Sequence, residues 1–283
     1  MPFQTYKGGL LPPHPSFSHP RLYVDDFLAG VKPGGPPEIG YYQQVLDHGG
    51  FPMDLNGPDP SNPPQIPDGI GDCGLAGPDH LQMALSSYAH GQFASWGNET
   101  LLAAYEHLAG YQLGDESTDN GLNLQDVLGF WRNEGFPTAA GGTDKILFFG
   151  ALRPGSWFRA ERVQAMRAFG GIVYGHQWPE SAEHQFPNAL TYVPGSPDAG
   201  GHCTVQLGEL TGENEIRDCC WGQVVPASTG FLLHTVVEAW VVGTMDFVEL
   251  SGRNPSGLDV AGMNDALAQL TGTSNPLGLR SIL

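Results

Sequence analysis

Apolar residues recur at helical spacing in the first half of the chain and in strand-like runs in the second. The helical pattern covers residues 74–91, 99–108 and 122–131, the last ending near Gly135. After Lys145, a further helix over 159–169 and a weak one near 264–270 accompany predicted strands at 146–149, 171–175, 203–208, 215–220, 222–226 and 236–243. Helices first and antiparallel strands afterwards predict an α+β fold.

Both ends of the chain lack such a pattern. Residues 1–50 are rich in Pro, Gly and His, with short regular pieces expected only near 21–29 and 41–46. Proline-rich backbone loses little conformational entropy on ordering, so we expect an extended arm that lies on the domain or on a partner. We assign residues 51–250 to one folded domain and 251–283 to a polar tail rich in Gly, Asn and Ser.

Composition narrows the classes of partner. The 283 residues include 12 Lys and Arg against 30 Asp and Glu, a net charge of −18. Such a surface repels phosphate backbones and anionic lipid, so we expect neither nucleic acid nor a membrane as partner. The sequence shows neither a signal peptide nor an apolar run of about 20 residues. Four cysteines are too few for a disulfide scaffold, which favours synthesis in a reducing cytoplasm.

Two fragments carry candidate chemistry. A Gly-rich loop ends at Asp72-Cys73-Gly74 and turns into the first predicted helix, where unpaired N–H groups and the helix dipole favour a thiolate. Far along the chain, Gly200-Gly201-His202 leads into an alternating strand. A histidine at such a position is the usual partner of a nucleophilic cysteine at a helix start.

This order of fragments resembles the papain-like cysteine peptidase fold, over roughly residues 50–245. Gln65, Asp72-Cys73-Gly74-Leu75-Ala76 and Met83 together look most like the leader-cleaving peptidase domains of bacteriocin exporters. Residues 53–60 and the strand with Glu238-Ala239-Trp240 also look like uncharacterised papain-like proteins of actinobacterial phages.

The resemblance implies roles for individual residues. Cys73 matches the nucleophile and His202 the general base, while Asp218 is the candidate that orients the imidazole. Cys219 is the alternative third member, because Cys219-Cys220-Trp221-Gly222 resembles the Asn-Ser-Trp-Gly run of papain relatives. Gln65 is the candidate oxyanion donor, although the family places its Gln where this chain has Pro67.

The other cysteines and histidines have simpler interpretations. We expect Cys203, Cys219 and Cys220 to be core residues of strands, and His176 to be a surface residue. The tryptophans Trp131, Trp221 and Trp240 are also expected in the core. Because no Cys-x-x-Cys spacing is present, the sequence predicts neither a zinc site nor another metal or cofactor.

The resemblance implies a cysteine-dependent hydrolase of peptide or amide bonds, encoded by a phage, with a peptide or protein as substrate. The alternative is a virion structural or assembly protein that keeps the fold with weak or no catalysis, and binds other virion proteins through its arm and tail. An acyl transferase with the same triad is a third possibility. The expected location is the host cytoplasm during synthesis and, for the alternative, the virion.

Overall fold

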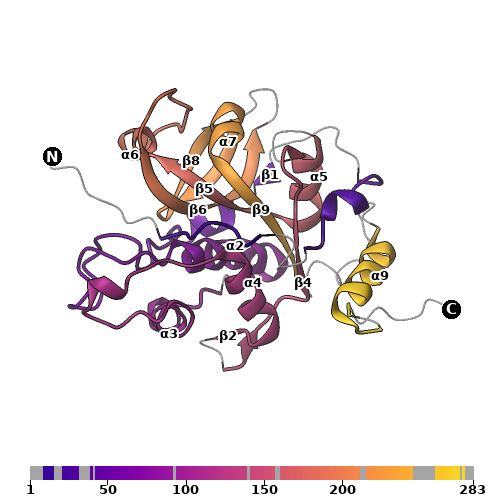
Figure 1. Cartoon of the computed structure of the whole chain (residues 1–283), viewed down its shortest axis with the longest axis horizontal. Coiled ribbons are helices and arrows are strands. Elements are labelled where there is room, and N and C mark those ends of the chain that lie inside the picture. Colours follow the sequence, from indigo (N-terminus) through magenta and orange to yellow (C-terminus); the bar gives the residue numbers. More distant parts are fainter. Residues whose placement is uncertain are drawn as a thin grey trace.

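The computed structural model describes residues 9–15, 21–31, 39–40, 42–91, 94–138, 141–156, 160–210, 215–244, 259–274 and 276–277. Figure 1 shows helices α2, α3 and α4 on one side of the molecule and the strands of a large sheet on the other. The α+β prediction is confirmed. None of the helices in the described part of the chain is both long and apolar enough to span a bilayer.

The helical side follows the predicted pattern closely. It consists of α1 (Gln43–Asp47), α2 (Cys73–His90), α3 (Asn98–Ala109) and α4 (Leu124–Asn133), with a 3₁₀ turn at η2 (Glu116–Thr118). The other 3₁₀ turn, η1 (Val24–Phe27), contributes Val24 to a different hydrophobic core. Gly91 and Gly110 end α2 and α3 in the left-handed conformation, at φ of 67° and 71°, which glycine adopts without steric cost.

The strands form an antiparallel sheet in the order β4-β9-β5-β6-β7-β8, and β1 pairs with β6. The strands are β1 (Ile39–Gly40), β4 (Phe148–Ala151), β5 (Ile172–Pro179), β6 (Asp198–Leu210), β7 (Glu215–Cys220), β8 (Gln223–Ser228) and β9 (Val236–Gly243). A separate hairpin joins β2 (Phe136–Pro137) to β3 (Thr143–Asp144).

The sheet separates two hydrophobic cores, because successive side chains of a strand point to opposite faces. On β6, Cys203 and Val205 belong to the core that also contains the apolar side of α2. On β5, Tyr174 and Trp178 belong to the second core. Elements α5 (Ala160–Phe169), α7 (Thr229–Thr235) and α9 (Val260–Thr271) contribute to that second core, and α6 (Glu180–Gln185) adds Ala182.

Several details differ from the expectations. Strand β6 begins at Asp198, five residues before its predicted start at 203, because Gly200 and Gly201 are themselves part of the strand. Strand β4 begins at Phe148 rather than at 146. Helices α6 and α7 were not predicted, since each is only one or two turns long and their sequences show little helical periodicity.

The arm and tail are described only in part. Residues 1–8, 16–20, 32–38 and 251–258 lie outside the described residues, so the domain boundaries at 50 and 250 stay predictions. Two pieces of the arm, η1 and α1, fall within or overlap the predicted short elements.

Candidate active site

Cys73 is the first residue of α2, at the end of a loop fixed by Asp119. The Asp119 carboxylate accepts a hydrogen bond from the backbone N–H of Gly71 at 3.0 Å and another from the Tyr105 hydroxyl. The same hydroxyl accepts from the N–H of Gly121 at 2.9 Å. This network joins the loop before the thiol to α3 and to the segment that leads into α4.

The thiol itself is buried rather than ionised. Burial raises the pKa of Cys73 to about 12, and the backbone N–H groups of Gly9, Cys203 and Gly74 only partly offset that increase. The expectation that the helix start makes this thiol a thiolate is therefore wrong for this structure. The favourable helix terminus is outweighed by the cost of placing a charge where water is excluded.

The N-terminal segment (residues 9–15) covers the thiol. The N–H of Gly9 donates to Cys73 Sγ at 3.3 Å. Leu10 is buried and donates its N–H to the carbonyl of Gly201 on β6 at 3.1 Å. On its other side, Leu122 donates to the Gly9 carbonyl and accepts from the N–H of Leu11, both at 2.7 Å. The segment is thus held like a short strand between the helical part and the sheet.

Two glycines make this close approach possible. A Cβ atom at Gly201 would lie 2.0 Å from the carbonyl oxygen of Leu10, and one at Gly121 would lie 2.2 Å from that of Gly9. Any larger residue at either position would push the segment away. Of the two glycines before His202, Gly201 therefore serves backbone contact with the N-terminal segment.

His202 does not contact Cys73 in this structure. Cys203 points towards α2, so its neighbour His202 points to the opposite face of β6. There its Nε2 lies 3.4 Å from Cys220 Sγ, and its ring stacks on Trp221 with centroids 4.3 Å apart. Burial lowers the pKa of His202 to about 3, so the ring is neutral at pH 7.

Neither candidate for the third member touches His202. Asp218 on β7 lies opposite Gln206 of the neighbouring strand β6. Burial raises the pKa of Asp218 to about 7, and a hydrogen bond from Thr204 partly lowers it. Cys219 lies on the other face of the sheet, with its Sγ 3.5 Å from His80. The expected orienting contact is therefore absent from the described residues for both.

Gln65 lies on the surface, away from the thiol. It lines a cavity of about 60 Å³ together with Asp68, Tyr111, Glu116 and Asp119. The cavity borders the loop that leads to Cys73, but no described contact joins Gln65 to the thiol.

Two buried side chains near the site were not predicted correctly. Glu238 on β9 lies over Gly175 and beside Leu10, with one carboxylate oxygen bonded to Trp240 Nε1 at 2.7 Å. Its only sequence signal is a charge inside an otherwise apolar strand. His176 was expected on the surface but is buried on β5, where its two ring nitrogens contact the hydroxyls of Thr204 and Thr235, both at 2.9 Å.

Comparison with solved structures identifies the fold. Xylellain, a cysteine protease from Xylella fastidiosa, is similar with a TM-score of 0.58 and 11% sequence identity, covering 87% of this chain and 98% of that one. Procathepsin B S9 from Trypanosoma congolense gives 0.54 and 10%, over 83% and 87% of the two chains. The ragweed pollen cysteine protease Amb a 11, in its proform, gives 0.54 and 12%, over 77% and 67%.

These similarities show that the chain has the fold of the papain-like cysteine proteases. At such low identity they establish the fold and not the activity. No family model matches the sequence, and no curated protein does.

Proposed function

We propose that this protein is a cysteine-dependent hydrolase of peptide or amide bonds, with Cys73 as its nucleophile. One observation carries the proposal: in a papain-like fold, a stretch of extended backbone already lies across the thiol at the start of α2. The Gly9 N–H reaches Cys73 Sγ, and Leu10 and Leu11 pair with β6 and with Leu122. The same donors and acceptors would hold a substrate peptide by main-chain hydrogen bonds.

The structure corresponds to a closed form of this proposed enzyme. A thiol with a pKa of about 12 carries almost no thiolate at pH 7. When the N-terminal segment leaves, water reaches Cys73, the desolvation cost falls, and the helix terminus then favours the thiolate. The attacking thiolate would form a thioester with the acyl carbon as the C–N bond breaks and the amine leaves with the proton given up by the thiol. Water would then hydrolyse the thioester, which releases the carboxylic acid and regenerates the thiol.

His202, Asp218 and Gln65 enter as separate proposals. His202 would take the thiol proton only after its ring moves to the face of β6 that carries Cys203. Asp218 lies on the opposite face of the sheet from Cys219, so it would stabilise the imidazolium only if its side chain changed face as well. Gln65 would need its loop to bend towards the thiol to donate to an oxyanion. Substituting each residue in the opened form described below tests these roles individually.

The experiment opens the site with a single substitution. Leu10 is buried beside Glu238, whereas its neighbour Leu11 is 42% exposed. Leu10→Asp places a second carboxyl group in that buried space and should release the segment, while Leu11→Asp should not. We expect Leu10→Asp to increase alkylation of Cys73 by iodoacetamide at pH 7 at least about tenfold, and to switch on hydrolysis of a fluorogenic peptide library.

Cys73→Ala in the Leu10→Asp background should abolish that hydrolysis. Retained hydrolysis would remove Cys73 from the mechanism. An alkylated Cys73 with no hydrolysis of any peptide or amide would remove the proposed activity, while leaving the closed arrangement intact.

A second candidate function is a phage-encoded virion or assembly protein with weak or no catalysis, present in the host cytoplasm when made and later in the particle. The observation in its favour is that neither member of the expected Cys–His pair is ionised at neutral pH, since their pKa values are about 12 and about 3. The arm and tail would then bind other virion proteins. Sedimentation of the full chain as large assemblies, with no hydrolysis by Leu10→Asp, would favour this function. A monomer that hydrolyses peptides would exclude it.

A further inference from the structure

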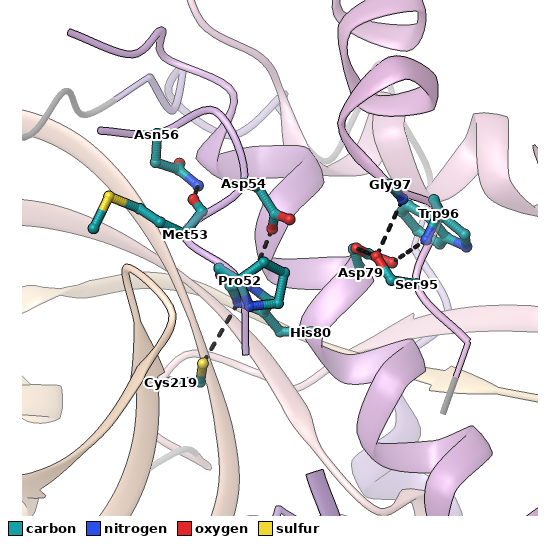
Figure 2. A network of polar contacts seen from close by, with 10 residues as sticks. All are labelled: Pro52, Met53, Asp54, Asn56, Asp79, His80, Ser95, Trp96, Gly97 and Cys219. Atoms are coloured by element: carbon teal, nitrogen blue, oxygen red, sulfur yellow. Dashed lines mark hydrogen bonds and ion pairs between the residues drawn. The ribbon is translucent and has the colours of Figure 1, made fainter. Parts of the chain in front are cut away.

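A second thiol meets an imidazole and a carboxylate behind the candidate site. Figure 2 shows Cys219 of β7, His80 of α2 and Asp54 of the loop before α2 converging on one another. Cys219 Sγ lies 3.5 Å from His80 Nδ1, and His80 Nε2 lies 3.0 Å from an Asp54 carboxylate oxygen. The Pro52 carbonyl also lies 2.7 Å from Nε2. The thiol thus lies within hydrogen-bond reach of the base, and the base lies within the same reach of a group that can orient it.

The three groups are held rigidly and out of water. Each residue is at most 2% exposed. Asp54 adopts a left-handed backbone conformation, with φ of 54°, which is rare for a residue other than glycine. Among the described residues neither of its buried carboxylate oxygens has a hydrogen-bond partner, and the one that faces the imidazole lies 3.0 Å from His80 Nε2.

The charges around His80 favour its protonated form. Burial alone would lower the pKa of His80, but Cys219 and Asp54 raise it well above its usual value. Two other carboxyl groups lie near Asp54, those of Asp72 and Asp79, and burial raises the pKa of both. The imidazole therefore accepts a proton readily, and the nearest thiol that can give one is Cys219.

The adjacent residue supplies an internal comparison. Cys220 Sγ also lies close to an imidazole, 3.4 Å from His202 Nε2. However, His202 Nδ1 is buried and has no hydrogen-bond partner among the described residues, and burial lowers the pKa of that ring to about 3. Burial also raises the pKa of Cys220 well above its usual value. Two neighbouring cysteines thus each face a histidine, and only Cys219 has a carboxylate behind it.

We propose that Cys219 is a modification site for small, uncharged electrophiles. The Cys219 thiol transfers its proton to His80, and the resulting thiolate attacks the electrophilic carbon. With a haloacetamide, the sulfur–carbon bond forms, the carbon–halogen bond breaks, halide leaves and the proton stays on the imidazole. An uncharged reagent is favoured because the three groups are buried away from water, where a charged reagent would lose its hydration.

The loop that covers this site differs from the segment that covers Cys73. Phe51 contacts the His80 ring edge-on, with centroids 5.4 Å apart, and the Pro52 carbonyl is 2.6 Å from where Gly222 would carry a Cβ atom. Gly49 and Gly50 precede this cover at φ of 118° and 88°, with open space around each. The reagent would enter by displacing residues 51–52, so the inference does not depend on the proposed function of Cys73.

The experiment measures iodoacetamide alkylation of the full chain by mass spectrometry between pH 5 and pH 9. We expect Cys219 to react at least about tenfold faster than Cys220 at pH 6, with a weaker pH dependence. Asp54→Asn and His80→Gln should each remove that advantage, whereas His202→Gln should preserve it. Phe51→Ala should accelerate alkylation of Cys219 several-fold and leave Cys220 unchanged.

The comparison of Cys219 with Cys220 needs no variant, so it holds even if a substitution prevents folding. Equal rates and equal pH profiles for the two cysteines in the wild-type protein would overturn the proposal. So would a folded protein in which Cys219 is not alkylated at any pH.

Discussion

Glu238 shows how the environment of one side chain sets its charge. The residue is buried, and within the described part of the chain one of its carboxylate oxygens has no hydrogen-bond partner while the other accepts a hydrogen bond from Trp240 Nε1–H. Burial raises its pKa from 4.5 to about 7, while Trp240 and Arg21 act in the opposite direction. The folded protein therefore retains a proton that the unfolded chain releases between about pH 4.5 and pH 7.

This difference predicts a pH-dependent effect of Glu238→Gln. Stability of the wild type should fall as pH rises from 4.5 to 7, because the folded state binds the proton more tightly, and the full penalty should remain above pH 7. Glutamine does not titrate, so the variant escapes the penalty. We expect its free energy of unfolding, relative to wild type, to increase by on the order of 3 kcal/mol between pH 5 and pH 8 in urea titrations. An unchanged difference across that range would contradict a raised pKa.

For single residues, the sequence predicted the position of Cys73 but neither the face occupied by His202 nor the role of His80. The Cys73 position at a helix start follows from its flanking loop and was predicted. The register of β6 decides which face of the sheet the His202 side chain occupies. The sequence does not show where this strand begins, because Gly200 and Gly201 lack a strand-like pattern. His80 is two helical turns from Cys73, a spacing that places both on similar faces of α2. That spacing was the available signal that His80 lies near the site. The partners of His80, which are Asp54 and Cys219, are distant in the sequence.

The element that most constrains the site is α2, which packs directly on β6. Gly77 allows this contact, because a Cβ atom there would lie 2.7 Å from Cys203 Sγ and 3.4 Å from Val205 Cγ2. The helix thus approaches the sheet more closely than a larger residue would permit. This close approach places the start of α2 beside Gly201 and the N-terminal segment.

Gly77→Ala should therefore destabilise the protein although alanine is the better helix former. We expect a loss of about 1–3 kcal/mol in the free energy of unfolding, from crowding against Cys203. Gly129→Ala in α4 is the matched substitution, since among the described residues no atom outside its chain neighbours and the backbone of its own helix lies within 4 Å of its would-be Cβ. It should stabilise by up to about 1 kcal/mol. Equal effects of the two substitutions would show that the α2–β6 contact is not tight.

Elements with a long periodic pattern were predicted to within a few residues, as for α2, α3 and β9. Short elements were not, because α6 and α7 are fixed by tertiary contacts of Ala182 and Phe231 with the second core rather than by their own sequences. The papain-like arrangement itself was identified through a resemblance and not through periodicity.

Over the whole molecule, the net charge of −18 opposes the compact state. Salt screens repulsion between exposed carboxylates that lie farther apart than about 10 Å. Raising NaCl from about 20 mM to about 500 mM at pH 7.5 should therefore increase the melting temperature by roughly 2–4 °C, the change expected for about 1 kcal/mol. Near the isoelectric point of about 4.7 the increase should disappear. A salt response of equal size at both pH values would rule out net charge as its cause.

The N-terminal segment has a consequence for any molecule that approaches Cys73 from solution. A peptide tethered to the same chain competes at an effective concentration in the millimolar range, whatever the total protein concentration. A free peptide that makes the same main-chain contacts would need to reach comparable levels to displace it. A free peptide therefore binds beside Cys73 only if it displaces residues 9–11. Only a ligand whose side chains add binding energy beyond that of Gly9, Leu10 and Leu11 gains entry at micromolar concentrations.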